Sequence, residues 1–133
     1  MPEYSNTRFT GYADVTTAAS TPTEIPIKLM GDSTAHTMVE GEGLSIQWFR
    51  AYTHQPSGVN KVYLSYDADG STEHITIAVS EESSGWSPME SVYGEEHTTY
   101  PAPAGKTWKI WALGMAASDN FHVHIGGTIT NKQ

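Results

Sequence analysis

The chain has 133 residues and no cysteine, and its seven Lys and Arg residues stand against fifteen Asp and Glu residues, which gives a formal net charge of −8. This balance argues against nucleic acid and membranes as partners, because both nucleic acid and anionic lipid attract clustered basic residues. The absence of cysteine excludes disulfides and thiolate metal ligands. No run approaches the ~18 apolar residues of a membrane span, no signal peptide is recognisable, and the length suits one domain with a modest core.

The first 24 residues, MPEYSNTRFTGYADVTTAASTPTE, are polar and rich in Thr and Ser. A segment of this composition buries little apolar surface, so it predicts an extended N-terminal arm over 1–24, ahead of a β-sandwich domain over 25–133. The alternative is a frayed terminus with a first strand near 12–17. In the arm, three spaced aromatic residues are candidate contacts with a partner protein: Tyr4, Phe9 and Tyr12.

Residues 27–36 read IKLMGDSTAH, which resembles the nucleophile block of the GDSL hydrolases, and Asp119 and His122 have the D-x-x-H spacing of that family. Such enzymes are α/β proteins, and this sequence has no capped amphipathic helix to cover a parallel sheet. Asp119 and His122 would also point to opposite faces if both were extended. We therefore interpret Gly31-Asp32-Ser33 as a turn and expect no catalytic residue and no enzymatic activity.

Four segments have the two-residue period of half-buried strands: 44–52, 62–66, 75–79 and 121–125. In the first of them, Leu44, Ile46 and Trp48 fall on one face. The segment 108–115 is apolar on both faces, which predicts a central strand. Turn residues separate the segments at 56–58, 67–70, 101–105 and 126–127. The pattern predicts an all-β protein, a single sandwich or jelly roll of about eight strands.

Two short patterns resemble metal sites. His122 and His124 have the H-x-H spacing of the cupin motif, but no acidic residue follows them to complete a ligand set. The segment 67–73, DADGSTE, resembles a calcium loop, but its glycine is fourth where an EF-hand has it sixth. We interpret the histidines as surface residues and Asp69-Gly70 as a hairpin turn, and we expect no metal and no cofactor.

Residues 81–105 form a long connection with aromatic residues among acids, serines and prolines. Exposed aromatic side chains in a loop are typical of contact surfaces, because they bury a large area with few rotatable bonds. The alternative is that these rings cover one end of the sandwich. The candidate partner contacts in this loop are Trp86, Met89, Tyr93 and Tyr100.

A family resemblance rests on the order of several stretches: a polar start, VEGEGLSIQWFR at 39–50, ITIAV at 75–79 with a long loop, YPAPAGKTWKIWA at 100–112 and FHVHIGG at 121–127. This order resembles the small jelly-roll head decoration (cement) proteins of tailed bacteriophages. In that family a loop ending in Pro-Ala-Gly leads into a long strand, and the chain closes on a strand of the V-x-V-x-G type. The resemblance covers roughly residues 39–127.

The resemblance implies a homotrimer, made in the host cytoplasm, that binds the major capsid protein on the outer surface of the virion and stabilises the head. A trimer is also expected because Trp108, Ile110, Trp111, Leu113 and Met115 offer more apolar surface than one sandwich readily buries. The acidic composition and the absence of cysteine agree with this function. The alternative is a carbohydrate- or receptor-binding β-sandwich, in which Trp86, Tyr93 and Tyr100 stack against sugar rings.

Overall fold

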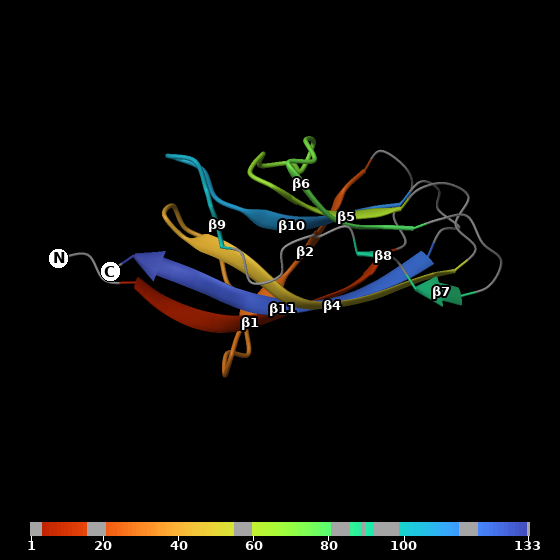
Figure 1. Ribbon diagram of the computed structural model, residues 1–133, viewed down its shortest axis with the longest axis horizontal. Helices are drawn as coiled ribbons and strands as arrows, with labels where there is room; N and C mark the ends of the chain where they lie inside the picture. The colour runs from red at the N-terminus through yellow and green to blue at the C-terminus, as the bar shows by residue number, and fades with distance from the viewer. Residues whose placement is uncertain are drawn as a thin grey trace.

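The computed structural model describes residues 4–15, 21–54, 60–80, 86–88, 90–91, 99–114 and 120–132. In these residues there is no helix, and eleven strands form two antiparallel sheets that face each other as a β-sandwich (Figure 1). The all-β class predicted from the sequence is therefore confirmed. Several strands are only two or three residues long, which accounts for the difference from the eight or so that the hydrophobic pattern predicts.

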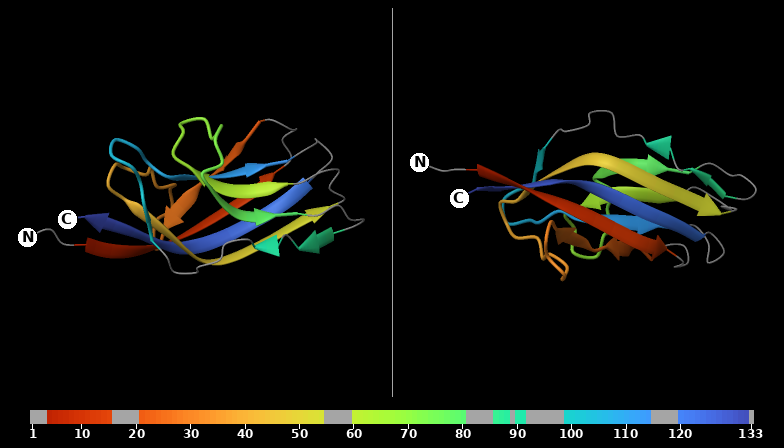
Figure 2. Two further views of the ribbon diagram at one scale, coloured as in Figure 1. Left: turned by 45° about the horizontal axis from the view of Figure 1, so that its top comes forward. Right: turned by 90° about the horizontal axis from the view of Figure 1, so that it is seen from below.

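The larger sheet, sheet A, has six strands and contains the first and the last strand of the chain. Its long central strands lie side by side (Figure 2), and Tyr4 pairs with Lys132, so the start of β1 and the end of β11 lie at the same end of the sandwich. In spatial order the strands are β3 (Ile27–Leu29), β1 (Tyr4–Val15), β11 (Asn120–Lys132), β4 (Gly43–His54) and β7 (Trp86–Pro88), with β9 (Tyr100–Pro101) paired to the start of β4.

The second sheet, sheet B, has five strands. The chain passes from sheet B to sheet A at Pro26, which separates β2 from β3 and, lacking an N–H, does not continue a ladder of hydrogen bonds. In spatial order the strands are β2 (Thr23–Ile25), β10 (Lys109–Leu113), β5 (Lys61–Ser65), β6 (Ile75–Val79) and β8 (Glu90–Ser91).

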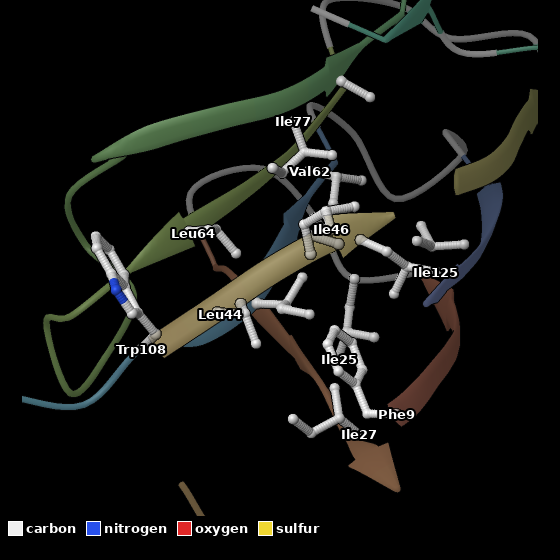
Figure 3. Close-up of a cluster of buried hydrophobic side chains, with 14 of the residues drawn as sticks. Phe9, Ile25, Ile27, Leu44, Ile46, Val62, Leu64, Ile77, Trp108 and Ile125 are labelled. Atoms are coloured by element: carbon white, nitrogen blue, oxygen red, sulfur yellow. The ribbon is translucent and has the colours of Figure 1, made fainter. Parts of the chain in front are cut away.

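Apolar side chains from both sheets meet between the two layers (Figure 3). At Leu44, Ile46, Val123 and Ile125 the inward-facing positions are those that the two-residue period predicts, because successive side chains of a strand point to opposite faces. The fully buried members include Leu44 on β4, Leu64 on β5, Ile77 on β6, Ile110 on β10 and Ile125 on β11. Trp108 closes one end of this core, where its indole N–H donates to the carbonyl of Tyr100 at 3.0 Å.

The N-terminal segment differs from the sequence prediction of an arm. Residues 4–15 form β1, which is hydrogen-bonded between β3 and β11, and Thr23–Ile25 form β2 of the other sheet. Phe9 is 1% exposed, and Val15 is buried with it. The hydrophobic period is weak because Gly11 takes an inward position, where the methyl groups of three isoleucines lie 3.1–3.3 Å from the place of a Cβ. The described part of the expected arm is therefore part of the sandwich.

A β-bulge in the middle of sheet A overturns two further sequence expectations. The glycines at 126 and 127 were expected to form a turn, but β11 runs through both of them. The pairing with β4 shifts here, because Gly126 lies opposite Trp48 and Gly127 opposite Ile46. The extra residue, Gln47, reverses the alternation along β4. Trp48 is therefore exposed, whereas it was expected to share the buried face of Leu44 and Ile46.

Glu42, in the loop between β3 and β4, is only 4% exposed, which is unusual for an acidic side chain. Its carboxylate lies 3.1 Å from Nε2 of His36 through both oxygens and accepts a hydrogen bond from the backbone N–H of Val39 at 2.6 Å. A carboxylate only accepts hydrogen bonds, so Nε2 of His36 carries a proton. These bonds lie within the loop between β3 and β4 and fix its conformation, and the backbone N–H of His36 connects the loop to β3 by donating to the carbonyl of Ile27 at 2.7 Å. Glu40, two residues earlier, is exposed.

The apolar strand β10 was expected to share its surplus surface with other subunits. The structure buries that surface within one chain, because the loop between β5 and β6 folds over the outer side of sheet B. Trp111 packs against Gly70 so closely that a Cβ there would lie 2.4 Å from the indole, and Tyr63 donates a hydrogen bond to the Gly70 carbonyl. The apolar cover of β10 is therefore no argument for a trimer. Met115 lies outside the described residues.

The position of β1 inside sheet A predicts that Phe9→Ala lowers the free energy of unfolding by about 3–5 kcal/mol, as is usual when a buried Phe is truncated. Tyr12→Ala on the same strand is the matched control, and its exposed side chain predicts a loss of less than about 1 kcal/mol. Chemical denaturation followed by circular dichroism measures both values. Equal, small losses for the two variants would contradict the placement of β1 in the core.

Candidate functional site

The N-terminal candidate residues lie in different surroundings. Phe9 is in the core and therefore cannot contact a partner, which corrects the sequence expectation. Tyr12, three residues further on, is 54% exposed on the outer side of sheet A. The backbone of Tyr4 lies in β1 opposite Lys132. Of these three residues, only Tyr12 is placed by the structure on a surface that a partner can reach.

The candidates of the long connection follow the edge of the sandwich. Trp86 belongs to β7, which pairs with the end of β4, and Tyr100 belongs to β9, which pairs with the start of β4 and is half-buried. Between them, β8 pairs with β6 of sheet B. The described parts of this connection therefore join both sheets. Met89 and Tyr93 lie outside the described residues.

The outer face of sheet B is covered by a loop, whereas the outer face of sheet A is exposed. The loop between β5 and β6 lies over sheet B and buries Trp111 and Tyr63. Sheet A instead exposes large aromatic side chains on its outer face, with Trp48 at 40% and Tyr52 at 50% in addition to Tyr12. Exposed aromatic residues on neighbouring strands are unusual on a surface that meets only water, so they mark a candidate binding site.

The register of the three central strands arranges this outer face in two complete rows. Tyr12 of β1, His124 of β11 and Arg50 of β4 form one row, and Asp14, His122 and Tyr52 form the next. Trp48 starts the adjoining row, opposite Gly126. We call this set the outer patch: Tyr12, Asp14, Trp48, Arg50, Tyr52, His122 and His124. With strands about 4.8 Å apart and about 3.4 Å per residue, the patch measures about 10 Å by about 14 Å.

The outer patch is organised around His124. Its imidazole meets the ring of Trp48 edge-on with centroids 4.9 Å apart, and the ring of Tyr12 edge-on at 5.9 Å. Such perpendicular contacts are favourable between aromatic rings. Beside them, Trp48, Phe49, Arg50 and His124 line a shallow hollow of about 330 Å³. The patch therefore combines fixed rings with a depression that a protruding group of a partner can enter.

Gly126 sets the position of Trp48. A Cβ on Gly126 would lie 2.3–2.5 Å from three atoms of the indole, so the ring rests on the bare backbone of β11. Gly127 allows a second close approach, because a Cβ there would lie 1.8 Å from the backbone oxygen of Ser45. Close packing of β11 against β4 therefore requires both glycines, and the indole of Trp48 lies against the backbone of Gly126.

Asp14 connects two other members of the outer patch. Its Oδ1 accepts a hydrogen bond from the hydroxyl of Tyr12 at 2.6 Å and also contacts Nδ1 of His122. The hydrogen bond from Tyr12 is the main reason that the pKa of Asp14 is lowered, and the contact with His122 adds to it. The same hydrogen bond raises the pKa of Tyr12. Asp14 is therefore ionised at neutral pH and fixes the orientation of both neighbouring rings.

The other chemical motifs of the sequence do not come together in the described residues. Ser33 lies in the exposed turn after β3, while His122 lies on β11, with β1 between these two strands. Asp119 is outside the described residues. Within the described ranges, no three His, Asp or Glu side chains are grouped closely enough to hold a metal ion. The described residues also include no helix that is long and apolar enough to cross a membrane.

Sequence reasoning did not identify Trp48, Arg50 and Tyr52 as site residues. All three lie on the predicted strand 44–52, where a strict two-residue period assigns them to the buried face of Leu44. The signal that reveals them is the pair of glycines at 126 and 127, but only when the register between β11 and β4 is known. The exposed histidines at 122 and 124 were correctly placed on one face.

The hydrogen bond from Tyr12 predicts that Tyr12→Phe moves the pKa of Asp14 upward, towards the ordinary value of an aspartate. Tyr52→Phe, which removes a hydroxyl elsewhere in the outer patch, should leave this pKa unchanged. Carboxyl carbon shifts followed by NMR during an acid titration measure the pKa in each variant. A wild-type pKa at or above the ordinary value would contradict the geometry.

The direction of this shift also fixes its effect on stability. A carboxyl whose pKa is lower in the folded chain than in the unfolded chain stabilises the fold above its ordinary pKa. Asp14 therefore contributes at neutral pH, and its contribution is lost as the pH falls through the lowered pKa.

Comparison with known proteins gives no family to which the chain can be assigned. No protein-family model matches the sequence. No curated protein matches it, and no solved structure matches its fold.

Proposed function

We propose that the protein is a non-enzymatic attachment protein of a bacteriophage head, a decoration protein that binds the major capsid protein through the outer face of sheet A. The observation that carries this proposal is the exposed outer patch on a sandwich whose opposite face is covered by its own loop. The resemblance of residues 39–127 to head decoration proteins supplies the identity of the partner. A surface fixed by strands is suited to permanent attachment, because little side-chain freedom is lost on binding.

The composition of the outer patch supports a protein partner. Interface residues that contribute most to binding are enriched in Trp, Tyr and Arg, whereas Lys and Glu are depleted in interfaces. The patch contains Trp48, Arg50, Tyr12 and Tyr52, and neither Lys nor Glu. The single carboxylate, Asp14, is already bonded within the patch. The patch therefore resembles the centre of a protein interface more than an ordinary solvated surface.

The net charge of −8 supports a partner with basic groups around the contact. Complementary charge accelerates association and disfavours wrong partners. A decoration protein on the outside of a head does not meet the genome, so an acidic surface agrees with that position. The homotrimer and the jelly-roll connectivity of the family belong to the same proposal and rest on the resemblance alone.

A carbohydrate- or receptor-binding module is the second candidate, and one observation favours it. Trp48 lies on Gly126, so one side of its indole is held by the backbone, and the side chain remains 40% exposed. Sugar rings stack on exposed aromatic rings of this kind, and Asp14 and Arg50 supply polar groups nearby. In the described residues the platform for a sugar would be Trp48 and Tyr12, whereas the sequence suggested Trp86, Tyr93 and Tyr100.

The proposal predicts that Trp48→Ala combined with Tyr52→Ala weakens binding to empty heads of the source virus by about 100-fold or more, the range expected when two central contacts are lost. Both side chains are exposed, so the variant should remain folded by circular dichroism. Sedimentation of heads with labelled protein measures the affinity. The same double variant tests sugars when it is compared with the wild type on a glycan array.

The matched control is Met30→Ala combined with Val39→Ala, which also removes two exposed apolar side chains, but from the loop between β3 and β4. This control should bind heads within about threefold of the wild type, because isolated surface contacts contribute little. Failure of the wild type to bind heads, together with saturable binding of an oligosaccharide that the patch variant loses, would replace the decoration function with the second candidate.

A further inference from the structure

A second concave site lies at the edge of the sandwich where the chain crosses from β2 to β3. It is a cleft of about 290 Å³, bounded by the β2–β3 crossing, the loop before β4 and the start of β10. The outer patch shares none of its lining residues. An apolar cavity of about 150 Å³ is large enough to bind benzene, so this cleft has room for a molecule of one or two rings.

The floor of the cleft is apolar. It consists of the core residues Ile25, Ile27, Met38, Leu44, Trp108 and Ile110. Of these, Ile25, Ile27, Leu44 and Trp108 are labelled in Figure 3. The indole N–H of Trp108 already donates to the Tyr100 carbonyl, so this residue offers only carbon atoms to a ligand. Trp108 and Met38 both make favourable contacts with aromatic rings, through the π-system and the sulfur respectively. The floor therefore favours an aromatic ligand over a polar one.

Among the polar side chains that line the cleft, His36 is held by a buried carboxylate. Glu42 accepts from its Nε2 through both carboxylate oxygens and is itself buried. In the neutral imidazole, Nδ1 is then a hydrogen-bond acceptor, and no described residue engages it. The ring is held by a buried partner, so this acceptor is positioned before any ligand arrives. A ligand with one O–H or N–H group matches it.

The charged groups of the cleft are already paired. The charged residues that line it are Lys109 and Glu24, and Nζ of Lys109 lies 3.4 Å from Oε1 of Glu24. A charged ligand would lose hydration without meeting a free opposite charge on the described lining. The pairing therefore selects an uncharged molecule.

From these features we infer that the cleft binds a small neutral aromatic molecule with a single hydrogen-bond donor, of the phenol or indole class. The ring lies against the apolar floor, and the O–H or N–H group donates to Nδ1 of His36. This site is independent of the outer patch, so a decoration protein and a carbohydrate-binding module would carry it equally.

Titration of phenol into the full chain, followed by NMR of the Ile and Met methyl groups, tests the inference. We expect saturable shifts at Ile27, Met38 and Ile110 with a Kd of about 1 mM or tighter, which is reasonable for a ligand of this size. Benzene has the same ring without the donor and should bind about tenfold more weakly. Absence of saturable shifts up to about 10 mM phenol, or shifts confined to Ile and Met methyl groups that do not line the cleft, would overturn the inference.

Ala35→Trp tests the site without disturbing the His36–Glu42 pair, because Ala35 is an exposed residue at the mouth of the cleft. It should weaken phenol binding at least tenfold. Ala104→Trp, at an exposed position in the turn before β10, is the matched control and should bind phenol as the wild type does. Equal phenol affinity in both variants would overturn the site.

Phenol binding no stronger than benzene binding in the wild type would overturn the role of His36.

Discussion

The bulge between β4 and β11 is the constraint on which the outer surface depends. Gly127 has no Cβ, so the backbone oxygen of Ser45 can lie closer to it than any other residue would allow. At this point β4 has one residue more than β11, because Gly126 pairs with Trp48 and Gly127 with Ile46. Beyond that point, the side chains of residues 48–53 face the opposite way from the one that the pattern of the first half of β4 predicts. Trp48, Arg50 and Tyr52 therefore point to the outside of sheet A, and Ala51 and Thr53 point inward.

The two sheets differ in how they accommodate a tryptophan on the outer face. On sheet B, the loop between β5 and β6 covers Trp111, and the positive φ of Gly70 lets the turn pass close to the indole. On sheet A, no comparable cover lies over Trp48 within the described residues, and the ring rests on Gly126. The first arrangement completes a core, whereas the second leaves apolar surface in contact with water. A surface of the second kind is expected where a partner supplies the missing cover.

Much of the fold could be predicted from local patterns. The strand at 75–79, the alternation at 122–125, the turn at Asp67–Gly70 and the turn that ends at Gly105 depend on residues close in sequence, and the structure confirms them. Strict alternation is not kept at 75–79, because Ile77 and Ala78 are both buried. The alternative of a strand near 12–17 overlaps only the end of β1, and the rest of β1 was missed because its inward positions include Gly11, where isoleucines of other strands fill the space. The His36–Glu42 pair was missed because nothing in the sequence marks one of two neighbouring glutamates as buried. Both depend on contacts that only the folded chain creates.

The central claim is that the outer face of sheet A is the surface that binds a partner. Hydrogen–deuterium exchange of the protein, free and bound to empty heads, tests this most directly because it maps the contact without any mutation. The account predicts that binding slows exchange in β1, β4 and β11 around the outer patch and leaves the loop between β5 and β6 unchanged. Slowed exchange in that loop over sheet B, with no change in the three central strands of sheet A, would contradict it.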